Sequence, residues 1–171
     1  GAALELRRAP GWRPVGLPKQ TLPAITLRRY PESDTTPPAV YARAIAQFRS
    51  GRIPEALALL EPMLRDQPRS PWLHELKGQI LFEGGRLAEA LGAYAQAARL
   101  APEEGLIRLS HARVLIELGQ PAQLRQALAE LDAAQRTERE SPFLWRQRAI
   151  AHGRLGELPL ADLALAEEAL L

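Results

Sequence analysis

Two stretches of the sequence share one pattern and decide the fold: GRIPEALALLEPMLRDQP at residues 51–68 and GRLAEALGAYAQAARLAP at residues 85–102. Each begins with glycine, has alanine five residues later and has proline seventeen residues after the glycine. A third glycine, Gly119, lies 34 residues after the second, and Gly156 follows 37 residues later. Self-similarity at a fixed period of this length indicates a chain built from stacked structural repeats.

A 34-residue period of this kind is typical of the tetratricopeptide repeat, a helix–turn–helix unit with small residues, an aromatic residue and a proline at fixed offsets. The second unit fits most fully, with Gly78, Ala90, Tyr94, Ala97 and Pro102 at these positions. We therefore predict an all-α, right-handed α-solenoid over residues 37–171, preceded by an extended leader at residues 1–36. The predicted units cover about residues 37–70, 71–104, 105–141 and 142–171.

The repeat pattern also predicts which residues pack together. Small side chains should let the two helices of a unit approach closely: Ala44, Gly78, Ala112 and Ala149 in the first helices, and Ala56, Ala90, Ala127 and Ala161 in the second. Larger side chains should fill the space between units: Leu60, Tyr94, Leu131 and Leu165. The glycines should end each first helix, because a left-handed residue there carries no Cβ penalty.

Three features depart from the pattern. Pro62 lies inside a predicted helix, which it should kink or shorten. The third unit has three extra residues, expected in its turn, so that Ala127 follows Gly119 by eight positions instead of five. Glu168 occupies a small position, and no polar capping helix follows the last unit. A solenoid normally closes with such a helix, so we expect this end to be truncated or covered by another chain.

Composition excludes several classes of function. The chain of 171 residues is 46% hydrophobic, 25% charged and only 5% aromatic, which fits one helical globular domain. It contains no cysteine, so disulfides, thiolate zinc sites and cysteine nucleophiles are excluded. No apolar run is long enough to span a membrane. Residues 1–20 lack the apolar centre of a signal peptide, so an exported protein would have to begin before this sequence.

The first part of the chain differs from the rest. Residues 1–34 contain six basic and three acidic residues, and seven of the fifteen prolines fall within the first 38 positions. We expect the stretch LPAITLRRYPES, residues 22–33, to be extended and to pack along the first repeat or across the concave face. A net charge of +3 is a weak electrostatic footprint, so we do not expect nucleic-acid binding.

The histidines do not form a recognisable catalytic or metal site. His74 and Glu75 begin HELKG, which resembles the HExxH zinc motif, but Gly78 stands where the second histidine is needed. His111 and His152 fall at different turns of neighbouring first helices, and Ser110 beside His111 points about 100° away from it. We therefore expect no enzyme activity, metal or cofactor in this chain.

What remains is recognition through the groove that the first helices line in such a solenoid. The repeat frame places several aromatic and charged side chains, of the types that anchor interfaces, on that face. We predict a binding site for an extended peptide or partner protein made of Tyr41, Arg49, Trp72, Glu75, Gln79, Phe82, Arg113, Phe143, Arg146 and Arg154. The frame also places on this face Ile45, Phe48, Leu109 and Ile116. The alternative is that about half of Phe48, Phe82 and Ile116 complete the core.

Three segments carry a more specific likeness: LRRYPESDTTPPAVYARAIAQFRSG at residues 27–51, SPWLHELKGQILFEGGR at residues 70–86 and ADLALAEEALL at residues 161–171. On these segments, residues 27–171 resemble the C-terminal repeat region of bacterial zinc metallopeptidases of the β-barrel assembly-enhancing type. The resemblance implies a periplasmic repeat domain that binds outer-membrane assembly machinery or its substrates. Any zinc would belong to a catalytic domain upstream, because the zinc motif of the family is not in this sequence.

An alternative of a different class is a structural scaffold with no peptidase attached. In that hypothesis, the uncapped end of the last repeat, around Leu165 to Leu171, pairs with a second copy of the chain.

Overall fold

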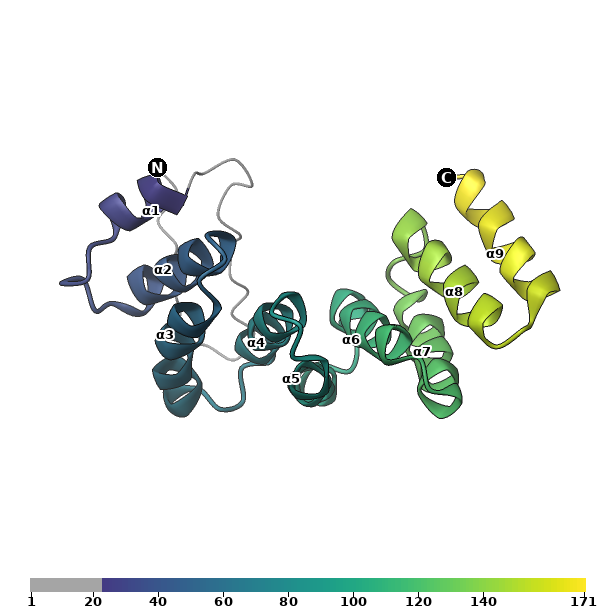
Figure 1. The fold of residues 1–171 in the computed structure, drawn as a ribbon, viewed down its shortest axis with the longest axis horizontal. Coiled ribbons are helices and arrows are strands. Elements are labelled where there is room, and N and C mark those ends of the chain that lie inside the picture. The colour runs from purple at the N-terminus through teal and green to yellow at the C-terminus, as the bar shows by residue number, and fades with distance from the viewer. Residues whose placement is uncertain (1–22) are drawn as a thin grey trace.

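The computed structural model describes residues 23–171, which contain helices joined by short connections and no strand (Figure 1). A short helix, α1 (Pro23–Arg29), comes first. Eight helices follow in four pairs, arranged as an extended array: α2 (Pro37–Arg49) and α3 (Ile53–Asp66), α4 (Pro71–Glu83) and α5 (Leu87–Leu100), α6 (Gly105–Leu118) and α7 (Pro121–Ala134), and α8 (Pro142–Arg154) and α9 (Leu158–Ala169). The predicted all-α solenoid is confirmed. No helix of the described part is long and apolar enough to cross a membrane.

The core is made by the small positions of the repeat. Ala56, Ala90 and Ala127, in α3, α5 and α7, are completely buried. Because each unit contributes one face to the next, the core continues as overlapping clusters along the array: one joins α2, α3 and α4, another joins α4, α5 and α6, and a third joins α6, α7 and α8. The solenoid is therefore held together by contacts between neighbouring units.

The turns inside the pairs follow the prediction. Gly51, Gly85, Gly119 and Gly156 all have φ between +73° and +76°, the left-handed conformation that an L side chain rarely adopts. Proline then occupies the first turn of α3 and α9, where its missing N–H leaves no helical hydrogen bond unmade.

Pro62 does not shorten its helix, which was one of the two effects expected from the sequence. The helix α3 continues through Pro62 to Asp66 and has 14 residues, as α5 has. Pro62 and Ala58, whose carbonyl would have accepted the lost hydrogen bond, are both exposed. Water can therefore satisfy that carbonyl, and the cost of proline inside a helix is lowered.

The three extra residues of the third unit are not in its turn, which corrects a second prediction. Only Gly119 and Gln120 separate α6 from α7, whereas three residues separate α4 from α5. The extra length instead adds a turn at the beginning of α7, so that Ala127 is its seventh residue, while Ala90 is the fourth residue of α5. The helix then ends at Ala134, and residues 135–141 connect it to α8.

The described end of the leader is partly helical rather than extended, because α1 forms over Pro23–Arg29. Pro23 fits the first position of a helix, and no glycine or proline interrupts the chain before Pro31. The helix packs against α2, so the expectation that this segment lies along the first repeat is correct for Pro23–Arg29. The expectation for Leu22 lies outside the described residues.

The last helix has an unpaired apolar surface. Only Ala161 and Ala164 of α9 are buried, while the leucines of this helix are exposed. Leu165 was predicted to fill space between units, but 49% of it is exposed. The equivalent side chains Leu60, Tyr94 and Leu131 are at most 4% exposed, because the next unit covers them. Residues 23–171 provide no such unit after α9.

Candidate functional site

The clearest part of the predicted groove lies where α4 and α6 are neighbours. The guanidinium carbon of Arg113 in α6 lies 4.3 Å from the ring centre of Phe82 in α4. Cation–π contact of this kind orients both side chains without consuming the hydrogen-bond donors of the arginine. Arg113 is exposed and Phe82 is half-buried, so the pair presents an ordered, positively charged element at the surface.

Glu75 adds a carboxyl group of unusual character to α4. Burial raises its pKa from 4.5 to about 7, because the charged form is poorly solvated there. Tyr41 in α2 and Tyr94 in α5 are buried as well. Their own burial, with a smaller contribution from the charge of Glu75, raises the pKa of both side chains. The charge of Arg113 opposes this shift at Tyr94, and that of Glu83 adds to it. Glu75 thus lies in an electrostatically connected region shared by four helices.

Trp72 and Gln79 complete this region of α4. Both are half-buried, and Trp72 packs against the cluster formed by Ala97, Ala98 and Ile107. Trp72 therefore supports the junction between α5 and α6 and also keeps part of its surface available. The structure brings together five of the predicted residues on two helices: Trp72, Glu75, Gln79, Phe82 and Arg113.

Tyr41 is not available as a contact residue. Only 6% of its surface is exposed, and it belongs to the core cluster shared by α2, α3 and α4. Leu109 and Ile116 are buried in the same way by α6, α7 and α8. Ile45, Phe48 and Phe82 are half-buried. Ile45 and Phe48 pack against the core cluster of α2, α3 and α4, and Phe82 packs against that of α4, α5 and α6. Of the three side chains offered as alternatives for the core, only Ile116 is fully enclosed.

Two of the predicted arginines make contacts inside the chain. Arg146 in α8 forms an ion pair of 2.7 Å with Glu168 at the end of α9. Arg154 donates a hydrogen bond to the carbonyl of Ile116 near the end of α6. Both are exposed enough to be reached by a partner, but Arg146 joins the two helices of the last unit and Arg154 joins the last unit to the one before it. A ligand role for them would compete with these contacts.

The remaining predicted residues stand apart from the α4–α6 region. Arg49 is the exposed last residue of α2, and Phe143 is an exposed residue in the first turn of α8. The frame did not single out Leu106, which is 53% exposed at the beginning of α6. Its signal was present in the sequence, because it occupies the same repeat position as Trp72 and Phe143.

The histidines have structural contacts. His74 Nε2 lies 2.8 Å from the carbonyl of Pro68, in the connection between α3 and α4. His152 Nδ1 lies 2.7 Å from Glu157 across the turn between α8 and α9. His111 is buried 3.4 Å from Glu130. Nowhere in residues 23–171 do three histidine, aspartate or glutamate side chains gather closely enough to hold a metal ion.

Comparison with known proteins supports this description of the fold. Residues 41–104 match the model of the tetratricopeptide repeat family. No curated protein sequence matches the chain.

Several solved structures of the protein MamA are similar to the chain. One, described as MamA MSR-1, has a TM-score of 0.70 at 16% identity, covering 86% of this chain and 83% of its own. Another crystal structure of MamA has a TM-score of 0.72 at 11% identity over 86% and 84% of the two chains. MamA from Desulfovibrio magneticus RS-1 has a TM-score of 0.67 at 19% identity, covering 73% of this chain and 69% of its own.

None of these matches includes a peptidase, so they add no support to the resemblance to zinc metallopeptidases. A tetratricopeptide match supports a protein-interaction or scaffold module rather than an enzyme. The chain has an all-α solenoid fold of the tetratricopeptide type, and its residues 41–104 carry the sequence pattern of that repeat family.

Proposed function

We propose that this chain is an assembly module that joins to a second copy of itself through the exposed face of α9. The observation that carries the proposal is the contrast between Leu165 and its equivalents. The side chain is 49% exposed, whereas Leu60, Tyr94 and Leu131 are buried by a following unit. Leu158 lies two turns earlier on the same side of α9, whereas Leu160 and Leu163 lie on another side of the helix, and all three are also exposed. Apolar side chains exposed along one helix in this way mark interaction sites.

The opposite end of the array favours pairing between two equal surfaces. There, α1 packs against α2, so the first unit already has a helix on its outer side (Figure 1). Stacking of α9 from one copy onto α2 of another would have to displace α1. Contact between two α9 surfaces displaces nothing, and a two-fold arrangement satisfies both copies at once.

Sedimentation velocity over a series of protein concentrations tests this proposal. We expect a concentration-dependent dimer that Leu165→Glu converts to a monomer, because the carboxylate would be desolvated in the contact. The matched control is Leu106→Glu, which changes an equally exposed leucine on α6. A wild-type chain that stays monomeric over the whole series would contradict the proposal, and so would equal effects of the two variants.

The α4–α6 region supports a second candidate function, the binding of an extended peptide or partner protein. The stacked Phe82–Arg113 pair and the partly buried Trp72 and Glu75 offer one apolar, one cationic and one acidic element within two neighbouring helices. A few such aromatic and arginine side chains dominate the energy of many protein interfaces.

A photoreactive amino acid tests the second candidate in cells that make the protein. We expect crosslinks to one partner when it replaces Gln79 or Arg113, and none when it replaces Ala95. Ala95 is an exposed residue of α5, a second helix of its pair. Crosslinks from Ala95 that equal those from Gln79 would show that the partner does not use the predicted face.

We also propose, from the sequence resemblance alone, that this solenoid is the repeat domain of a periplasmic zinc metallopeptidase acting in outer-membrane protein assembly. The chain itself carries no HExxH motif, so the proposal requires that motif in an upstream domain. Sequencing the complete gene tests this directly. A reading frame without HExxH would leave the scaffold as the function to pursue.

A further inference from the structure

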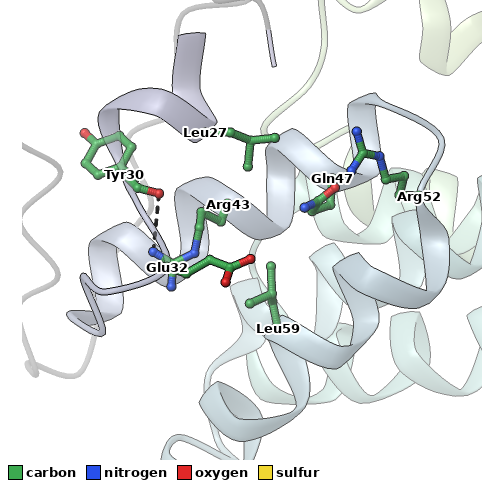
Figure 2. Close-up of a pocket in the computed structure, with 7 residues that line it drawn as sticks. All are labelled: Leu27, Tyr30, Glu32, Arg43, Gln47, Arg52 and Leu59. Carbon is green, nitrogen blue, oxygen red and sulfur yellow. Dashed lines mark hydrogen bonds between the residues drawn. The ribbon is translucent and has the colours of Figure 1, made fainter. Parts of the chain in front are cut away.

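The array contains a cavity at its N-terminal end, away from both surfaces discussed above. It has a volume of about 470 Å³ and lies between α1, the connection that follows α1, and the helices α2 and α3 (Figure 2). Leu27 of α1 and Leu59 of α3 provide apolar walls, and Arg43 and Gln47 of α2 provide polar groups. A volume of this size is typical of small-molecule sites, and the lining combines two leucines with three charged residues, a glutamine and a tyrosine.

Arg43 has only part of its hydrogen-bonding capacity in use. It is 6% exposed, and its Nη1 donates to the carbonyls of Pro31 and Asp34, both at 2.7 Å. Its Nε is buried and has no hydrogen-bond partner. All hydrogen bonds that the described residues make with Arg43 involve Nη1. The opposite edge of the guanidinium, formed by Nε and Nη2, is the one whose two parallel N–H groups match a carboxylate.

Gln47 lies one helical turn after Arg43 and therefore on the same side of α2. Its Oε1 is also buried without a hydrogen-bond partner. Two residues that line the cavity therefore each keep a buried atom without a partner, a donor on Arg43 and an acceptor on Gln47. Buried polar groups in this condition cost free energy unless a ligand or water satisfies them.

The charges around the cavity also favour an anion. Arg52, at the beginning of α3, is a second cationic residue of its lining. Residues 23–171 place no carboxylate within ion-pair distance of Arg43 or Arg52. The acidic residues beside the cavity are Glu32, an exposed side chain of its lining, and Asp34, whose carboxyl interacts electrostatically with Arg43 without forming an ion pair. A buried cation without an anionic partner is costly, so an incoming carboxylate gains affinity here.

We propose that this cavity binds a carboxylate that carries a neighbouring amide N–H and an apolar side chain, as in an N-acylated amino acid or the C-terminus of a peptide. The carboxylate pairs with the Nε and Nη2 edge of Arg43. The amide N–H donates to Oε1 of Gln47, and the apolar side chain contacts Leu27 and Leu59. Glu32 is the internal competitor, since its own carboxylate is tethered at the rim of the same site.

The test titrates the chain with N-acetyl-L-leucine and with N-acetyl-L-leucinamide, which lacks the carboxylate. NMR follows the Nε–H resonance of Arg43, and the Nε–H of Arg113, which stacks on Phe82, is the internal control. We expect the acid to shift the Arg43 resonance saturably and to leave Arg113 unchanged, whereas the amide binds at least tenfold more weakly. Equal affinity for acid and amide, or an unmoved Arg43 resonance, would overturn the proposal.

Two variants that leave Arg43 in place make the test specific. Gln47→Leu should weaken the acid about threefold to tenfold, the value of one hydrogen bond, and Glu32→Gln should tighten it. Arg113→Gln is the matched control and should change nothing. If neither Gln47→Leu nor Glu32→Gln alters the affinity, the acid binds elsewhere and the proposal is wrong. N-acetyl-Ala-Ala-Leu then distinguishes the sources: a site for chain termini binds it as well as the free acid, and a site for small acids does not.

Discussion

The ring of Tyr94 in α5 packs directly onto Gly78 in α4, so closely that a Cβ built at residue 78 would lie 2.9 Å from the ring carbons Cδ1 and Cγ. Both ring atoms are part of the rigid base of the side chain, and Tyr94 is 4% exposed. The contact therefore has no room for a larger residue. This one pair explains why the second unit has glycine at the small position of its first helix, where the other units have alanine.

Gly78→Val should destabilise the chain by about 1–3 kcal/mol, because the added methyl groups force Tyr94 out of a packed core. Chemical denaturation followed by circular dichroism measures the change. Gly92→Ala is the matched control within the same unit, since a Cβ there meets nothing within 4 Å. That variant should raise the stability by about 0.5–1 kcal/mol through helix propensity. A Gly78→Val variant as stable as the wild type would show that the helices separate easily.

Glu130→Gln should cost about 2 kcal/mol, because Arg108 would keep a partly buried charge without its carboxylate. Arg108 lies 2.7 Å from Glu130, and the two side chains are only 22% and 14% exposed. Burial acts to raise the pKa of Glu130, but the interactions with His111 and Arg108 outweigh it and hold the pKa below its usual value. Thermal unfolding at neutral pH measures the loss.

The comparison for this variant is Glu89→Gln. Glu89 pairs with Arg86 at 2.6 Å, but about half of each side chain is exposed to water. Solvent-screened pairs contribute little to stability, so the unfolding midpoint should not change measurably. Equal losses in the two variants would mean that burial does not distinguish these ion pairs.

The repeat pattern predicts the fold because it fixes contacts between side chains. The offsets predicted Gly78 as a position of close helix contact, which it is, and the small positions at Ala56, Ala90 and Ala127 are buried as the repeat pattern requires. The 34-residue repeat pattern could not predict α1, because this helix precedes the first repeat. The relevant signal there was local: Pro23 at a helix start and an uninterrupted stretch up to Pro31.

The contacts of surface residues were less predictable. The repeat pattern predicts on which helix face a side chain lies, but not which other residue it contacts. Arg146 and Arg113 were both predicted on the groove face of first helices, yet Arg146 pairs with Glu168 and Arg113 stacks on Phe82. The sequence shows Glu168 as an exception, because it stands where the repeat has a small residue. Its pairing with Arg146, however, depends on where α9 places its last residues. The unpartnered atoms of Arg43 and Gln47 could not be foreseen, since their burial depends on α1.

Arg43→Met should release α1 from the first unit. Its guanidinium donates to carbonyls of the connection after α1, at Pro31 and Asp34, and methionine leaves those acceptors without a donor, at a cost of about 1–3 kcal/mol. Limited trypsin digestion should then cut after Arg28 or Arg29 sooner than in the wild type. Mass spectrometry identifies these fragments. The control is Arg49→Met, which removes an exposed arginine of the same helix and should leave cleavage there unchanged. If both variants resist trypsin equally, Arg43 does not hold α1.

Glu75→Gln should stabilise the chain above pH 7 and have no effect near pH 4.5. Burial raises the pKa of Glu75 to about 7 in the folded chain, against 4.5 as its ordinary value. Between these two values the folded chain holds a proton that the unfolded chain has lost, so the stability of the wild type falls as the pH rises through this window. Above pH 7 the full cost of the buried charge is present, on the order of 3 kcal/mol. Glutamine never ionises and escapes this cost.

The measurement is the difference in unfolding free energy between Glu75→Gln and the wild type at several pH values. Other groups, including Glu130 and Glu157, titrate in both proteins, so their contributions cancel in the difference. The difference should grow from pH 4.5 to pH 7 and then remain level. Tyr41 and Tyr94, whose pKa values are raised, stay neutral throughout this range. A difference that does not vary with pH would show that Glu75 is solvated in the folded chain, and the α4–α6 region would then lose its acidic element of unusual pKa.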